Sequence, residues 1–72
     1  MAAIQGMVDG LAARLKTNPD DPDGWVRLVR AYAVLGDTEK RDAAYAGARA
    51  RYAGRPQVLE QLDVAARAEP MR

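Results

Sequence analysis

The sequence predicts an all-α protein, an antiparallel stack of helices without a β-sheet. Ala is abundant and β-branched residues are few, a composition that favours helices over strands. Apolar residues recur three or four positions apart in four segments, and Pro, Gly or Asp stands where most segments begin or end. Because the connections between the segments are short, sequential helices are expected to lie antiparallel, as neighbours in one domain that covers residues 1–72.

The first predicted helix covers about residues 4–18. Its apolar stripe consists of Ile4, Met7, Val8, Leu11 and Leu15, which share one helix face. The helix is expected to stop at Asn18, because Pro19 disfavours the helical conformation in the residue before it.

The second predicted helix begins after Asp21, whose side chain can cap it, with Pro22 in the first position, where a missing N–H costs nothing. Its stripe consists of Trp25, Leu28, Val29 and Tyr32, with Leu35 in the last turn. Gly36 follows, and glycine readily adopts the left-handed conformation that ends helices.

Two further helices follow the same rules. Asp37 is expected to cap the third, which ends at Gly54 and carries the stripe Ala44, Tyr45, Ala48 and Tyr52. The fourth is expected to begin at Pro56 and to run toward Pro70, with the stripe Val58, Leu59, Leu62, Ala65 and Ala66.

A spacing of thirty-four residues relates the second helix to the fourth. It separates Pro22 from Pro56, Trp25 from Leu59, and Leu28 from Leu62. Thirty-four is the length of a tetratricopeptide repeat, and residues 22–55 resemble the signature of that family. The matching positions are Trp25, Leu28, Tyr32, Gly36, Tyr45 and Ala48. The resemblance implies one full repeat at about 22–55, with a half repeat on either side at about 4–18 and 56–69.

Three positions depart from the repeat pattern. Val29 stands where a small residue normally lets two helices approach, Arg41 replaces the usual Ala, and Ala53 replaces the closing Pro. We expect Val29 and Arg41 to widen the helix crossing slightly, with the stem of Arg41 extending toward solvent. The alternative is a generic three- or four-helix bundle whose spacings agree by chance.

A narrower resemblance covers residues 4–36. It is carried by the runs MVDGLAARL at 7–15, NPDDPDGW at 18–25 and LVRAYAVLG at 28–36. These runs are similar to the start of the repeat domain in CycH-type cytochrome c maturation proteins, membrane-anchored factors whose periplasmic repeats hold apocytochrome c for haem attachment. The resemblance implies chaperone-like holding of a client polypeptide on the periplasmic side of a bacterial membrane. Because the membrane helices of that family are absent here, we expect either an excised piece or a short stand-alone relative.

Charge and composition argue against two kinds of partner. Eleven Lys and Arg against ten Asp and Glu leave a net charge of +1, too balanced for a dedicated nucleic-acid binder. Arg49, Arg51 and Arg55 are interpreted as cations near a helix end, where the helix dipole favours them. No window approaches the length of an apolar membrane span, so we expect a soluble segment.

The residue inventory argues against an enzyme. Ser, His and Cys are all absent, so the usual nucleophile–base pairs, disulfides and His-based metal sites cannot be built. Asp20, Asp21 and Asp23 cluster, but they lack the Gly and the bidentate Glu of a calcium loop, and helix capping is the better interpretation. We expect no catalytic residue, metal or cofactor.

The candidate binding surface follows from the repeat resemblance, because the first helices of successive tetratricopeptide repeats line a concave groove that binds peptides. The corresponding residues are Val26, Arg27, Arg30, Ala33 and Val34 in the full repeat, and Gln57, Glu60, Gln61 and Val64 in the following half repeat. Arg27 and Arg30 lie three apart and can point into the groove together, where they could bind an acidic side chain or a free C-terminus of a client. The alternative is two solvated arginines.

A carboxylate clamp of the chaperone-tail kind is not expected, since Val26 and Arg30 replace its Lys and Asn. A second hypothesis is structural. Fewer than three repeats usually leave an outer face exposed, so the apolar stripes of the first and last helices could associate with a second copy. The chain would then be a generic scaffold or a self-assembly element, and an enzyme is the third and least favoured reading.

Overall fold

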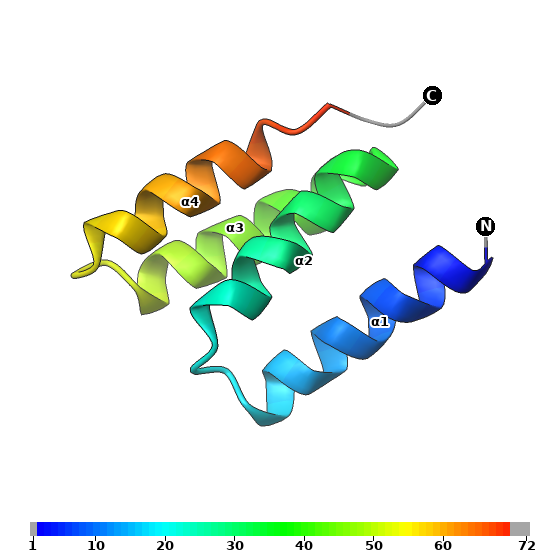
Figure 1. Cartoon of the computed structure of the whole chain (residues 1–72), viewed down its shortest axis with the longest axis horizontal. Coiled ribbons are helices and arrows are strands. Elements are labelled where there is room, and N and C mark those ends of the chain that lie inside the picture. The colour runs from blue at the N-terminus through cyan, green and yellow to red at the C-terminus, as the bar shows by residue number, and fades with distance from the viewer. Residues whose placement is uncertain (1, 70–72) are drawn as a thin grey trace.

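The computed structural model describes residues 2–69, with side chains from residue 6 onward, and contains four helices (Figure 1). These are α1 (Ala2–Thr17), α2 (Pro22–Leu35), α3 (Thr38–Arg51) and α4 (Pro56–Ala66). Sequential helices run antiparallel, and residues 2–69 contain no strand. The predicted all-α stack of four helices is confirmed. The predictions for the Ile4 side chain and for Pro70 lie outside this described part.

The central helix of the stack is α2. It packs against each of the other three helices, α4 packs against both α2 and α3, and α1 packs against α2 alone. Figure 1 accordingly shows α1 as a flank beside α2, away from α3 and α4. The molecule is therefore a group of three mutually packed helices with a fourth added on one side.

A tight connection joins α1 to α2. The Oδ1 atom of Asp21 accepts a hydrogen bond from the Gly24 N–H at 3.1 Å, so Asp21 caps α2 as predicted, with Pro22 in the first turn. Gly24 lies where the side chains of Asp21 and Leu15 closely approach the start of α2. A Cβ at this position would lie 2.7 Å from Asp21 Oδ2 and 3.0 Å from Leu15 Cδ2.

The backbone carbonyl of Pro19 ties this connection to two other elements. The indole Nε1 of Trp25 donates a hydrogen bond to it at 2.8 Å, and the hydroxyl of Tyr52, at the end of α3, donates to the same oxygen at 3.2 Å. The sequence placed both aromatic residues on apolar stripes. Their polar partner belongs to a different part of the chain and was not predicted.

The turn between α2 and α3 matches its prediction. Gly36 has a φ of 76°, in the left-handed region that glycine adopts without strain. The N–H of Asp37 donates to the carbonyl of Tyr32 at 2.9 Å, which closes the end of α2. Asp37 also caps α3, because its Oδ1 accepts a hydrogen bond from the Lys40 N–H at 3.2 Å.

The end of α3 comes earlier than predicted. The helix stops at Arg51, and Tyr52 follows with a φ of −111°. The expectation that Gly54 would end the helix is wrong, because the chain turns without any left-handed residue there. The start of α4 at Pro56 is as predicted, although Arg55 at its N-cap makes no side-chain hydrogen bond.

The core contains side chains from all four helices. Val29 and Leu62 are its largest fully buried members. The others are Val8, Leu15, Leu28, Tyr32, Ala44, Ala48, Tyr52, Val58 and Ala65. Tyr32 and Ala48 share this core, and Trp25 and Tyr45 pack against it. Arg41 remains at the surface, where its guanidinium pairs with Asp42 at 2.9 Å.

The apolar stripes of the terminal helices are only partly covered. Val8, Leu15, Val58 and Leu62 are buried within the chain, whereas Met7 is 76% exposed, because α1 packs against α2 alone. Association of these stripes with a second copy stays a prediction. Within the described part of the chain, none of the helices has the length and apolar character that a membrane span needs.

Candidate functional site

An open groove of about 700 Å³ lies between α2 and α4. Both helices run antiparallel to α3, so they run parallel to each other and form its two walls (Figure 1). Its lining consists of Val26 and Arg30 from α2, Gln57, Glu60, Gln61, Val64 and Ala65 from α4, and Arg67 and Ala68 just after α4. We call this the α2–α4 groove.

Six of the nine residues predicted for the concave surface line this groove. They are Val26, Arg30, Gln57, Glu60, Gln61 and Val64. The geometry therefore brings together residues from two helices that lie about thirty positions apart in the chain. Whether they bind a partner stays a prediction, but they do share one surface.

The other three predicted residues lie elsewhere. Arg27 is exposed but does not line the groove, because one further residue along α2 turns it about 100° away from Val26. Val34 is half-buried outside the lining. Ala33 is only 2% exposed, one turn after the fully buried Val29, so its assignment to a binding surface is wrong.

Arg67 is a groove residue that the sequence reasoning missed. It follows α4 directly and lies on the opposite wall from Arg30. Arg67 stands thirty-four residues after Ala33, but Ala33 is buried, so the repeat spacing does not identify Arg67 as a groove residue. The expected pair of Arg27 and Arg30 is thus replaced in the groove by Arg30 and Arg67.

The floor and the walls of the groove differ in polarity. Val26 is half-buried and Ala65 is almost fully buried, while Val64 is 64% exposed beside them. Gln57 and Gln61 lie one helical turn apart on α4 and are both exposed, so their amides can face the same occupant. The groove therefore has an apolar floor and hydrogen-bonding side chains along one wall.

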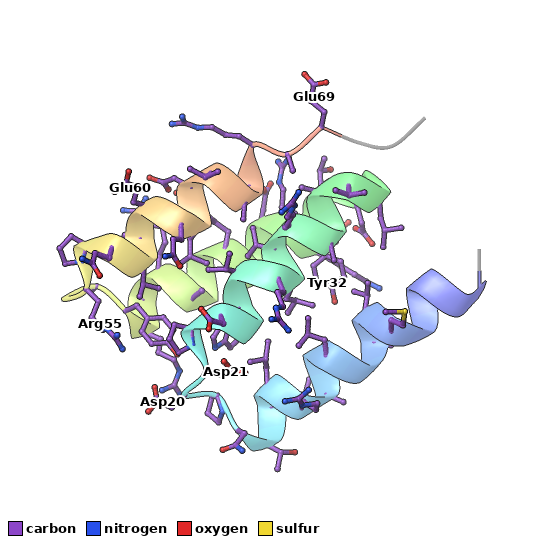
Figure 2. The ribbon with its side chains drawn as sticks, viewed as in Figure 1. Asp20, Asp21, Tyr32, Arg55, Glu60 and Glu69 are labelled. Atoms are coloured by element: carbon purple, nitrogen blue, oxygen red, sulfur yellow. The ribbon has the colours of Figure 1, made fainter. Side chains whose placement is uncertain are left out.

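Charge is distributed unevenly along the groove. Glu60 lies in the N-terminal half of α4 (Figure 2), whereas Arg67 follows the C-terminal end of that helix. Arg30 lies one turn beyond Val26 on the other wall, also toward the C-terminal end. Among side chains 6–69, these three charged groups form no hydrogen bond or ion pair with one another or with other side chains.

A polar cluster joins α3 to α4 on the neighbouring surface, whose lining also includes Arg67. The Tyr45 hydroxyl donates a hydrogen bond to Asp63 and accepts one from Arg49 at 2.8 Å, and the Arg49 Nη1 lies 3.7 Å from Asp63. The hydrogen bond with Tyr45 raises the pKa of Arg49 above its ordinary value. The sequence placed Arg49 at a helix end as a simple cation. Its partners, Tyr45 four residues before it and Asp63 fourteen residues after it, were not predicted.

The fold and the groove define a class of protein, a small helical module with an open, mixed-polarity groove between two parallel helices. The chain is similar to cytochrome c-type biogenesis proteins named CycH. It is 50% identical over 62 residues to the CycH protein of Bradyrhizobium diazoefficiens, a match that covers 86% of this chain and 17% of the relative. It is 52% identical over 50 residues to that of Rhizobium meliloti, covering 68% of this chain and 13% of the relative.

The chain spans less than a fifth of the length of the curated relatives that it matches. No protein-family model matches the chain, and no solved structure matches it at a significant level. The resemblance to CycH-type proteins is thus confirmed, while the tetratricopeptide assignment stays a prediction.

Proposed function

We propose that this chain is a non-catalytic protein-binding module that holds a client polypeptide in the α2–α4 groove during cytochrome c maturation. One observation carries the proposal. Six residues selected for binding from the repeat register line one open groove, which two separate helices build. The similarity to cytochrome c-type biogenesis proteins supplies the process in which such a groove would act.

The chemistry of the groove suits an unfolded polypeptide. An apolar side chain of the client can cover Val64, and burying a side chain of this size contributes about 1.5 kcal/mol. The amides of Gln57 and Gln61 can each donate and accept hydrogen bonds, which matches the alternating groups of a peptide backbone. We therefore propose apocytochrome c, the haem-free chain, as the client.

The proposal includes a repeat architecture. In this interpretation α2 and α3 form the full repeat at about 22–55, α1 is the half repeat before it, and α4 begins the half repeat after it. The left-handed Gly36 between α2 and α3, and the packing of α4 on both helices, support it. The narrower resemblance implies that the module works on the periplasmic side of a bacterial membrane.

Binding of a haem-free cytochrome c tests the proposal. We expect saturable binding of a fluorescently labelled apocytochrome c, kept reduced, in a polarisation titration. Val64→Glu should weaken it by about tenfold or more, or about 1.4 kcal/mol, because a carboxylate then replaces the apolar contact in the groove. Val64 is exposed in the free chain, so its helix content should remain unchanged by circular dichroism.

The matched control is Met7→Glu. Met7 is even more exposed than Val64 but lies on α1, away from the groove. This variant should bind the apocytochrome with unchanged affinity. No saturable binding to the wild-type chain, or equal weakening by both substitutions, would overturn the proposal.

A further inference from the structure

We infer that the α2–α4 groove selects client segments with an acidic side chain among apolar ones, and that Arg30 and Arg67 bind this carboxylate together while Glu60 disfavours a second one. The inference rests on the proposed function and deepens it, because it states which client chemistry the groove accepts. It replaces the pair of arginines expected from the sequence with one that spans both walls.

The two arginines lie on opposite walls of one groove. Arg30 comes from α2 and Arg67 follows α4, and neither is paired with another side chain among residues 6–69. A guanidinium group offers several N–H donors in a planar fork that fits a carboxylate. Because both residues line the same groove, a client carboxylate at this end meets positive charge from each wall.

The position of Glu60 makes the two ends of the groove differ in charge. Glu60 and Arg67 are seven residues apart, which is roughly 10 Å along a helix. Among side chains 6–69, Glu60 and Arg67 form no ion pair. Glu60 repels a carboxylate that lies at its own end of the groove. The C-terminal end of the groove therefore favours an acidic side chain, and the N-terminal end disfavours one.

The apolar residues of the groove favour a client segment in which apolar side chains flank the acidic one. Val26, Val64 and Ala65 line the same groove as the arginines. Val64 is exposed and Arg30 is one helical turn from Val26, so an apolar client side chain can cover the valines while its acidic neighbour reaches the arginines. A purely acidic segment would leave this apolar surface uncovered.

Short synthetic peptides test the inference directly. The probes are fluorescein-labelled 12-residue peptides of alternating Leu and Gln with one central Glu, and matched peptides with Gln or Lys in its place. Their ends are acetylated and amidated, which removes the terminal carboxylate as a ligand. We expect the Glu peptide to bind about fivefold tighter than the Gln peptide, the Lys peptide to bind weakest, and added salt to reduce the difference.

Charge-reversed variants identify the residues responsible. Arg30→Glu with Arg67→Glu should reverse the order, so that the Lys peptide binds tightest. The control is Arg14→Glu with Arg27→Glu, which makes the same change in net charge at exposed positions outside the groove and should keep the Glu preference. Glu60→Gln should improve binding of a peptide with a Glu near each end. A preference that both double variants reverse, or that neither changes, would overturn the inference.

The results for the peptides and for the apocytochrome separate the two proposals. If apocytochrome binding is weakened by Val64→Glu but the peptides show no charge preference, the selectivity is wrong while the proposed function stands. If the peptides show the preference and its reversal but the apocytochrome does not bind, the groove chemistry stands and the proposed client is wrong.

Discussion

Single residues hold the connection between α1 and α2 in place. The Pro19 carbonyl accepts hydrogen bonds from Trp25 and from Tyr52, thirty-three residues further along the chain. Gly24 leaves room for the side chains of Asp21 and Leu15 at the first turn of α2, and both would have to shift to accommodate a Cβ there. These contacts fix where α2 starts, and α2 forms one wall of the groove.

Ionisation of Tyr52 should lower the stability of the folded protein at alkaline pH. Its burial raises the pKa of its hydroxyl above the ordinary value of about 10, and the carboxylate of Asp20 raises it further. Because the folded pKa exceeds the unfolded one, the stabilisation is complete below pH about 10 and is lost as the pH rises through the folded pKa. We expect the free energy of unfolding to fall in that range, measured by urea unfolding from about pH 8 upward.

Tyr52→Phe separates this residue from the other titrating groups. At neutral pH the variant should lose about 1 kcal/mol, because the hydrogen bond to the Pro19 carbonyl is absent. Above pH about 10 its stability should fall less steeply than that of the wild type, since position 52 no longer ionises. Identical slopes for the two proteins would contradict this assignment.

The helices depend on local capping and on a few cross-links between them. Asp21 and Asp37 cap α2 and α3, whereas α4 begins without a side-chain cap. The cluster of Tyr45, Arg49 and Asp63 then joins α3 to α4 across the helix contact. The helices are thus stabilised in two ways. Caps join residues that are neighbours in the sequence, and the cluster joins residues that are far apart in the sequence.

The two aspartate caps should differ in their contribution to stability. Asp21→Ala should lower the free energy of unfolding by about 1 kcal/mol or more, because its hydrogen bond is partly buried and begins the central helix. Asp37→Ala, at an exposed cap, should cost somewhat less. The control is Asp9→Ala at an exposed position within α1, which should be close to neutral in the same urea titration. Equal losses for all three substitutions would rule out capping as the cause.

At the scale of the whole molecule, α2 organises the other helices. It packs against all of them, whereas α1 packs against α2 alone. The chain has a radius of gyration of 11.4 Å, close to the roughly 11 Å expected of a compact domain of this length. The groove is a consequence of this arrangement, because it requires α4 to lie parallel to α2 on the side opposite to α1.

This arrangement predicts unequal local stability. We expect the backbone amides of α1 to exchange with deuterium faster than those of α2, because α1 can separate from the stack by losing contacts with one helix only. Amides in α2 should be the slowest, since they open only when the core does. Exchange followed by NMR at neutral pH measures both. Protection in α1 equal to that in α2 would show that the four helices unfold as one unit.

The sequence by itself determined the number, type and order of the helices. Periodic apolar residues, the caps at Asp21 and Asp37 and the left-handed Gly36 are all signals within a few contiguous residues, so they act before any tertiary contact forms. The repeat spacing of thirty-four residues added which residues of α2 and α4 would share a surface, and six of nine line one groove.

Only the tertiary structure decided which side chains are buried and which polar atoms form hydrogen bonds with each other. The exposure of Met7, the burial of Ala33, the hydrogen bond from Tyr52 to Pro19 and the replacement of Arg27 by Arg67 in the groove all depend on how separate helices pack. Periodicity places a residue on a helix face, but it does not state which neighbour covers that face. That choice is made by contacts between residues far apart in the chain.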